Sequence, residues 1–413
     1  MSKPRMLPFI LLILASAVSI KAAEVEFVGS YPMEQAFDVV VQWPYAYVCE
    51  HTYESGLVIF DIVDPANPTP VSYYSSPDRT QDLAISGNFA YLADDYAGLQ
   101  VVNISDPYNP TFEASYDTGD RAYAIYTCKN FAYLADGYDG FYIFDISNPS
   151  TPVRVGYYDT PYSSSGVFVR GNTAYFTDHD YTLDIFDVAN PDNPILLGDF
   201  ETPGYARRGI YVLGDYAYIP DWGAGLQIIN TSNPQQPQLA STYDTPGHAF
   251  GIFVYDFAYV TDSEQGLHVI DIHDPANPQL IASYDTPGEA RGVYIADDLI
   301  YIADESSLQI LSLSTVGIDE NLAGLPSGFE LYQNYPNPFN SSTKIEYYLP
   351  DIVDVSISIY NIAGQIVYHS NLLNQQPGFH SLNWENSELS SGTYIYSVVA
   401  GDYSICKKCT YMK

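Results

Sequence analysis

The chain has 413 residues, of which 40 are tyrosine, 28 are glycine and 28 are proline. This composition favours short strands joined by tight turns. The formal net charge is −35, and between Glu24 and Ser314 there are 8 Lys and Arg residues against 41 Asp and Glu residues. Such an acidic surface excludes nucleic acid as a natural partner, because it repels phosphates, and it would attract divalent cations or basic partners.

Residues 1–23 are predicted to be a secretory signal peptide. Lys3 and Arg5 precede an apolar run that ends at Ile20, and small residues follow at Ala22 and Ala23. The cleavage site stays open, because Lys21 fits poorly beside it. No other stretch has the roughly 18 to 20 apolar residues that span a bilayer, so we expect an exported mature chain without a transmembrane segment.

Residues 24–314 consist of one phrase repeated seven times. An Ala-Tyr-hydrophobic-x-Asp element is followed by a Leu-x-Ile-x-Asp-Ile element and an Asp-Pro-x-Asn-Pro turn. The second element begins at residues 57, 99, 141, 183, 226, 267 and 308. Each period of about 42 residues reads as four short strands, which predicts the blades of a seven-bladed β-propeller rather than a β-solenoid.

The two ends of this region are in phase with each other. Phe27–Tyr31 corresponds to the outer strand Leu280–Tyr284, and the last repeat stops without an outer strand of its own. We therefore predict that Phe27–Tyr31 completes the blade built by residues 292–313. Such a closure joins the ends of the ring and removes two exposed strand edges. The repeats resemble the LVIVD-repeat family, which implies an extracellular β-propeller and says little about activity.

Residues 315–328 are predicted to be a linker, and residues 329–413 a second domain. Short alternating strands recur there every 8–12 positions, as in Thr343–Leu349 and Val355–Tyr360, which indicates a β-sandwich. The order of its motifs, from Leu331 to Lys413, resembles the C-terminal sorting domain of type IX secretion in Bacteroidetes-like bacteria. This resemblance implies an Ig-like fold related to hook-capping proteins, contact with the outer-membrane secretion machinery, and a secreted or cell-surface location.

Positions that stay constant across the seven copies serve blade geometry first. The aspartate that closes the first element is such a position, since its carboxylate can accept backbone N–H bonds in the following turn. We interpret the series as structural, and a ring-like calcium site is the alternative. Its members are Asp94, Asp136, Asp178, Asp221, Asp262 and Asp304.

Positions that vary between copies can specialise. Loops between outer and inner strands are expected on the same face as the turns after the constant aspartate, and five of the eight basic residues of the repeats lie there. Arginine and aromatic side chains at a channel mouth could bind a carboxylate or a sugar, although the arginines could instead neutralise Asp221 and Glu289. The predicted ligand-binding residues are Arg207, Arg208, Trp222, His248, Phe250 and Arg291.

No nucleophile elbow, zinc-binding His pair, phosphate loop or EF-hand loop occurs in the sequence. The sequence therefore favours a secreted or cell-surface, non-enzymatic propeller that binds protein or polysaccharide. The alternative is a secreted hydrolase or lyase that acts on extracellular polysaccharide. A histidine among His51, His179 and His248 that meets a carboxylate in a cleft would favour the enzyme.

Overall fold

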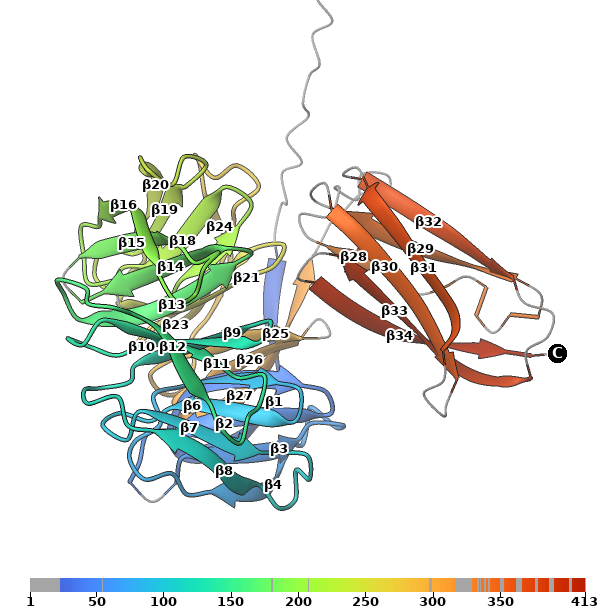
Figure 1. The fold of residues 1–413 in the computed structure, drawn as a ribbon, viewed down its shortest axis with the longest axis horizontal. Coiled ribbons are helices and arrows are strands. Elements are labelled where there is room, and N and C mark those ends of the chain that lie inside the picture. The colour runs from blue at the N-terminus through green and yellow to red at the C-terminus, as the bar shows by residue number, and fades with distance from the viewer. Residues whose placement is uncertain are drawn as a thin grey trace, which may run out of the picture.

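The computed structural model describes residues 23–413 except 54, 180, 207, 297–298, 316–328, 333, 335, 338, 341, 350–352, 362–365, 376–377, 386–389, 401–402 and 413. The predicted signal peptide, apart from Ala23, and nearly all of the predicted linker lie outside the described residues. Within the described residues, all regular secondary structure is β-strand, which confirms the all-β prediction. These strands form a propeller, up to Thr315, and a separate C-terminal unit (Figure 1).

Seven four-stranded antiparallel blades make the propeller, as predicted. Neighbouring inner strands contact one another around a central channel, and the last of them contacts the first. The inner strands are β1 (Ala23–Gln42, C-terminal half), β5 (Asp82–Ser86), β9 (Ala124–Cys128), β13 (Ser164–Arg170), β17 (Tyr211–Leu213), β21 (Ala249–Val254) and β25 (Val293–Ala296).

The second strand of each blade carries the Ala-Tyr element, and the third carries the Leu-x-Ile element. The second strands are β2 (Tyr45–Glu50), β6 (Phe89–Ala93), β10 (Phe131–Ala135), β14 (Thr173–Asp178), β18 (Tyr216–Pro220), β22 (Ala258–Asp262) and β26 (Leu299–Ala303). The third strands are β3 (Leu57–Asp61), β7 (Leu99–Asn103), β11 (Phe141–Asp145), β15 (Thr182–Asp187), β19 (Leu226–Asn230), β23 (Gly266–Asp271) and β27 (Glu305–Thr315).

The outer strands of the first six blades are β4 (Thr69–Tyr74), β8 (Thr111–Tyr116), β12 (Val153–Tyr158), β16 (Ile195–Glu201), β20 (Gln238–Tyr243) and β24 (Gln279–Tyr284). The seventh outer strand is the N-terminal half of β1. It pairs antiparallel with β27, so that Phe27 lies opposite Leu311 and Tyr31 opposite Leu308. The predicted closure is therefore confirmed, and β1 is longer than predicted because it continues into the inner strand of the first blade.

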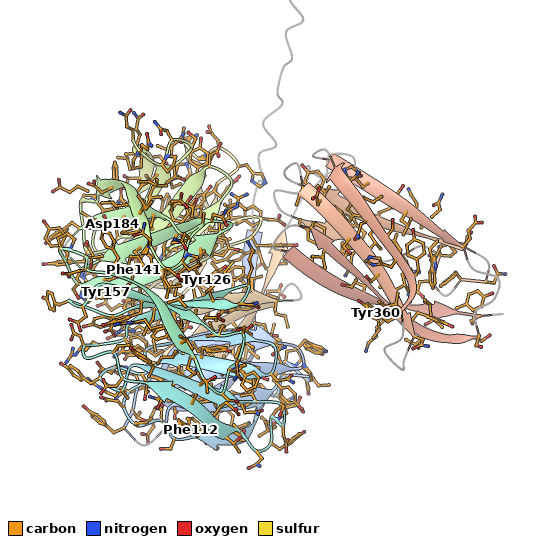
Figure 2. The ribbon with its side chains drawn as sticks, in the orientation of Figure 1. Phe112, Tyr126, Phe141, Tyr157, Asp184 and Tyr360 are labelled. Atoms are coloured by element: carbon orange, nitrogen blue, oxygen red, sulfur yellow. The ribbon has the colours of Figure 1, made fainter. Side chains whose placement is uncertain are left out.

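The hydrophobic core lies between the faces of successive blades. Phe141 of β11, for example, stacks on Phe176 of the next blade with ring centroids 3.9 Å apart. Outer strands leave some apolar side chains exposed, as Phe112 does at the periphery in Figure 2. Side chains alternate between the two faces of each strand. Both faces of a blade are therefore buried near the channel, whereas the outer strands expose both apolar and polar side chains.

The C-terminal unit is a β-sandwich. A three-stranded sheet has the order β28 (Glu330–Leu331), β29 (Ser342–Leu349), β32 (Gly378–Glu385), and a four-stranded sheet has the order β31 (Ile366–Gln375), β30 (Val353–Asn361), β33 (Gly392–Ala400), β34 (Tyr403–Tyr411). Tyr347 and Trp384 of the first sheet and Ile357 and Tyr396 of the second belong to one buried cluster. The sandwich is as predicted, while its Ig-like character stays a prediction.

Candidate functional site

Two kinds of loop share one face of the propeller, as the repeat phase predicted. The residue after a constant aspartate pairs with a residue at or just before the start of the inner strand of the next blade, in the bridges Asp95–Ala122 and Trp222–Ala249. We call this surface the loop face. On the opposite face, the hydrogen bond from Ile104 N to Asn88 O joins the end of a third strand to the hairpin between inner and second strands.

The constant aspartates lie beneath the loop face, and their side chains are buried. Thr80 donates a hydrogen bond to Asp94 at 2.9 Å, and Thr286 donates one to Asp304 at 2.7 Å. The amide of Gly288 also donates to Asp304, at 2.9 Å. These donors belong to the loop before the inner strand rather than to the following turn, which corrects the partner that we expected. The structural role stays a prediction, and these bonds support it because they fasten one loop to another.

Asp178 comes nearest to the predicted arrangement. The amide of Thr182, at which β15 begins after the following turn, donates to it at 2.9 Å. At Asp94, Asp136 and Asp221, burial opposes the effect of such bonds on the pKa and outweighs it. Burial raises the pKa of Asp94 and of Asp221 to about 6, and that of Asp136 to about 7.

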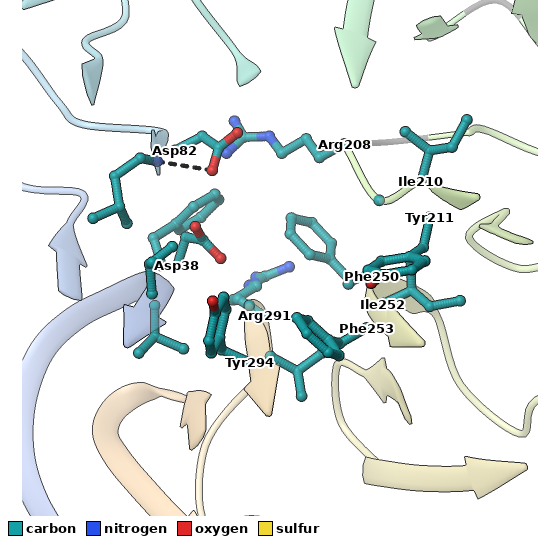
Figure 3. A pocket seen from close by; sticks show the side chains of 18 of the residues that line it. Asp38, Asp82, Arg208, Ile210, Tyr211, Phe250, Ile252, Phe253, Arg291 and Tyr294 are labelled. Atoms are coloured by element: carbon teal, nitrogen blue, oxygen red, sulfur yellow. Dashed lines mark hydrogen bonds between the residues drawn. The ribbon is translucent and has the colours of Figure 1, made fainter. Parts of the chain in front are cut away.

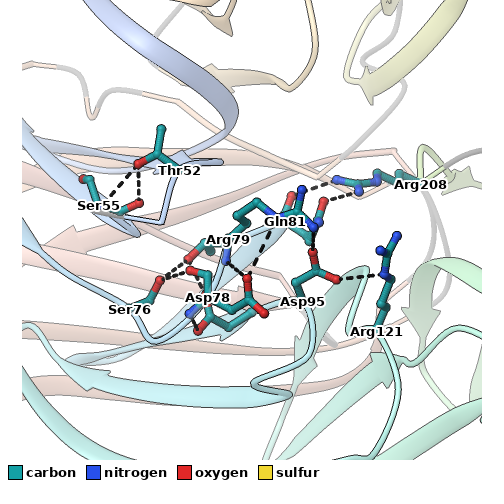
Figure 4. A network of polar contacts seen from close by, with 11 residues as sticks. Thr52, Ser55, Ser76, Asp78, Arg79, Gln81, Asp95, Arg121 and Arg208 are labelled. Carbon is teal, nitrogen blue, oxygen red and sulfur yellow. Dashed lines mark hydrogen bonds and ion pairs between the residues drawn. The ribbon is translucent and has the colours of Figure 1, made fainter.

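The residues just before the inner strands form a ring at the channel mouth. Arg208 reaches across it from the fifth blade to the second, where its Nη1 donates to the carbonyl of Gln81 at 3.2 Å and its Nη2 to the Gln81 side chain (Figure 4). The guanidinium carbon also lies 4.4 Å from the ring centroid of Phe37 and 5.4 Å from that of Tyr123. Arg208 therefore spans the mouth, with its cation close to two aromatic rings.

Arg291 lies on the same ring and has carboxylate partners. Its Nη2 lies 2.7 Å from a carboxylate oxygen of Glu305 and also pairs with Glu289. The guanidinium lies 4.7 Å from the ring centroid of Phe250. For this arginine the neutralising interpretation fits the contacts, with Glu289 as the anticipated partner.

Trp222 and His248 form a stacked pair on the loop face, with ring centroids 4.4 Å apart and planes inclined by 24°. Phe250 meets Trp222 edge to face at 6.3 Å. The structure thus brings together five of the six predicted ligand-binding residues along one side of the channel mouth. The sixth, Arg207, lies outside the described residues.

The histidines give little support to catalysis. His51 stacks on Phe37, and burial together with the charges of Arg208 and Arg79 lowers its pKa to about 4. His179 packs edge-on against Tyr123. The Nδ1 of His248 lies 3.4 Å from a carboxylate oxygen of Glu264, and both side chains are at the surface, 40% and 57% exposed.

Sequence reasoning missed a row of tyrosines on the loop face. Tyr53, Tyr96 and Tyr138 follow the aspartate position in the first three blades, and they are 69%, 54% and 73% exposed. The guanidinium carbon of Arg79 lies 5.2 Å from the ring of Tyr53, and that of Arg121 lies 4.7 Å from the ring of Tyr96. Both arginines pair with the buried carboxylate of Asp95 (Figure 4). A comparison of the repeats in the sequence could have found these tyrosines, because blades five to seven lack a tyrosine at this position.

A second missed feature is a carboxyl pair inside the channel. Asp38 and Asp82 follow Phe37 and Gln81 directly in the first two blades, at a position where the other five blades carry glycine or alanine. Burial raises the pKa of both, and the charge of Asp82 raises the pKa of Asp38 further. Asp82 accepts the amide of Ile125 from the third blade at 2.8 Å, so the pair also links blades.

Across the described residues, no three His, Cys, Asp or Glu side chains are grouped so that they could hold a metal ion. None of the described segments is a helix that is both long and apolar enough to cross a membrane.

A closed seven-bladed propeller with an aromatic and arginine-rich loop face, followed by a β-sandwich, defines the class of protein. The repeats match the LVIVD repeat over more than half of the chain, so the chain belongs to the LVIVD repeat family. The matches are residues 35–76, 78–118, 122–160, 163–202, 203–245 and 246–286. The closing blade falls outside them, since it is assembled from both ends of the propeller.

The C-terminal unit matches the secretion system C-terminal sorting domain over residues 333–411. The chain therefore carries a sorting domain, which supports secretion or a cell-surface location and implies interaction with the secretion machinery. None of the curated proteins compared with the chain matches it.

Solved structures resemble the chain in fold alone. The β-propeller domain of Cps50 (Swd1) from Myceliophteria thermophila has a TM-score of 0.58 at 11% identity, over 70% of this chain and 99% of that one. The WD40 β-propeller domain of Doa1 has a TM-score of 0.56 at 9% identity, over 70% and 97%. PorZ, an essential surface component of the type IX secretion system of Porphyromonas gingivalis, has a TM-score of 0.51 at 14% identity. That match covers 92% of this chain and 60% of PorZ.

Proposed function

We propose that this chain is an exported, non-enzymatic β-propeller that binds extracellular polysaccharide or protein through its loop face. The observation that carries the proposal is the set of aromatic side chains there, the exposed Tyr53, Tyr96 and Tyr138 and the half-buried stacked pair of Trp222 and His248. Aromatic side chains on loops of a rigid frame provide contact area at a small cost in conformational entropy.

The charge of the loop face favours a neutral polysaccharide over an anionic one. Asp95 is neutralised by Arg79 and Arg121, and Arg291 by Glu289 and Glu305, so these arginines leave little net positive potential. A sugar ring can stack on a tyrosine or tryptophan face without a counter-charge. The surface position of the His248–Glu264 pair supports binding over hydrolysis, because a catalytic pair works best in a cleft that excludes water.

The loop-face aromatics are expected to govern binding to neutral glycans. We expect the triple variant Tyr53→Ala, Tyr96→Ala and Trp222→Ala to lose at least about tenfold in affinity on a glycan array or by calorimetry. The variants Tyr73→Ala and Phe112→Ala remove equally exposed aromatics from outer strands and serve as controls. Unchanged binding in the triple variant would rule out this face, and capture of a protein but no glycan would assign a protein partner.

The sorting domain is expected to be needed for export but not for folding of the propeller. Deleting residues 329–413 leaves all seven blades intact, because the strands of the blades end at Thr315. We expect the shortened chain to stay in the periplasm and to keep the unfolding temperature of the propeller. Cell fractionation and thermal unfolding measure the two effects, and appearance of the shortened chain outside the cell would contradict the proposed export route.

A further inference from the structure

The inner strands carry a second aromatic feature, deeper in the channel than the mouth. Two residues after the position that Asp38 and Asp82 occupy, blades three to seven place an aromatic residue, and each ring contacts the next. Successive centroids lie 4.9, 4.9, 5.2 and 5.0 Å apart. We call this set the aromatic girdle, and its members are Tyr126, Phe168, Tyr211, Phe253 and Tyr294.

Blade packing does not require these aromatics. The first two blades have Val40 and Ala84 at the same position, and their strands pair as the others do. Four of the five girdle side chains also remain partly exposed, which side chains present only to fill a core would not be. The exposed surface of the girdle therefore needs another explanation.

The girdle lines two cavities. One, of about 200 Å³, lies toward the loop face and is bordered also by Asp38, Asp82, Arg208 and Arg291; Figure 3 shows girdle residues Tyr211, Phe253 and Tyr294 around it. The other, of about 600 Å³, lies toward the opposite face, and we call it the well. Its size and its mostly apolar lining are those of small-molecule sites.

Two cationic side chains line the well. Lys129 is in the hairpin after β9, and Arg170 ends β13, in neighbouring blades, and both line the well. The Nη1 of Arg170 donates to the carbonyl of Gly214 at 2.5 Å, which fixes the guanidinium near the fifth blade. In a repeat region with only 8 basic residues against 41 acidic ones, two at one cavity mark the place where an anionic group is best accommodated.

The remaining polar groups of the well suit hydroxyls. Three of the five girdle residues are tyrosines, and Thr127 adds a hydroxyl to the lining. Phenol and threonine hydroxyls both donate and accept hydrogen bonds, and aromatic faces pack against the C–H faces of a pyranose. We propose that the well binds a sugar ring that carries a carboxylate, a hexuronate, with its ring against Tyr126 and Phe168 and its carboxylate toward Lys129 and Arg170.

The test is calorimetric titration of the full chain with glucuronate, glucose and cyclohexanecarboxylate. We expect glucuronate to bind at least about tenfold more tightly than either of the others, because only glucuronate has both the hydroxyls and the charge. Glucose binding as tightly would overturn the role of the cations. Cyclohexanecarboxylate binding as tightly would overturn the assignment to a sugar, and absence of glucuronate binding would overturn the site.

Two variants locate the site. Tyr126→Ala gives the third blade the residue that the second blade carries at this position, so the blade is expected to fold, and Arg170→Met keeps an unbranched side chain without the charge. Each is expected to weaken glucuronate binding about tenfold, and Arg170→Met is expected to leave glucose binding unchanged. The control Tyr73→Ala lies on an outer strand. Glucuronate affinity that is equal in all three variants and the unaltered chain would place the ligand elsewhere.

Discussion

Deleting residues 23–31 is expected to lower the unfolding temperature of the propeller by about 10 °C or more and to broaden the transition. This segment supplies the outer strand of the closing blade, and Val25, Val28 and Tyr31 pack against buried clusters on both sides of it. Each of these half-buried side chains contributes on the order of 1 kcal/mol. Together with the lost strand pairing, the deletion removes a large part of the roughly 5–15 kcal/mol that stabilises a typical protein.

A point substitution tests the closure of the ring without shortening the chain. A Cβ on Gly29 would lie 2.3 Å from the carbonyl oxygen of Pro65, in the first blade. Gly29→Val is therefore expected to lower the unfolding temperature by several degrees. Ser30→Val, at the next and exposed position, is the matched control and is expected to change it by about 1 °C or less. A synthetic peptide of residues 23–32 is expected to restore part of the stability of the shortened chain, and a shortened chain that melts like the intact one would contradict the closure.

Much of this fold could be predicted from the sequence because every blade solves the same packing problem. The period gave the number of blades, and the phase of Phe27–Tyr31 gave the closure. The length of β1 could not be predicted, since nothing between Tyr31 and Phe37 signals that one strand serves two blades. The predicted hydrogen-bond donor to the constant aspartates was also wrong in most copies. A carboxylate beneath the loop face can accept hydrogen bonds from either of the two loops there.

The candidate site was harder to predict for a physical reason. Arg208 and Gln81 are 127 residues apart and meet only because side chains on opposite blades reach across a narrow mouth. Comparison of the copies finds variable positions, but it does not say which of them touch. It could have found Asp38, Asp82 and the girdle, because the first two blades differ from the other five at both positions.

The buried aspartates of the constant series are expected to make the folded propeller more stable in mildly acidic solution. Burial raises the pKa of Asp94, Asp136, Asp221 and Asp304, so the folded chain binds these protons more tightly than the unfolded chain. A raised pKa contributes stability that is present below about pH 4 and lost as the pH rises to about 6 or 7. His51 acts in the opposite direction, since its pKa is lowered to about 4 and its contribution is lost as the pH falls below about 6. We therefore expect the unfolding temperature to rise by about 10 °C between pH 8 and pH 5.

Asp136→Asn isolates one of these groups. Its Oδ1 accepts the Thr118 hydroxyl at 2.6 Å, a bond that an amide oxygen can keep, and the nearby charges of Asp120 and Asp139 no longer oppose an ionised neighbour. A pKa of about 7 in place of 3.8 corresponds to a loss of roughly 2–4 kcal/mol in the free energy of unfolding at pH 8. The variant is therefore expected to unfold about 5 °C higher at pH 8, and its unfolding temperature is expected to depend less on pH.

Asp145→Asn is the control, because hydrogen bonds from Ser147 lower the pKa of Asp145 and keep its titration below this pH range. Thermal unfolding at pH 5, 6, 7 and 8 decides the matter: equal slopes for both variants and the unaltered chain would mean that Asp136 is ionised in the folded propeller at no cost.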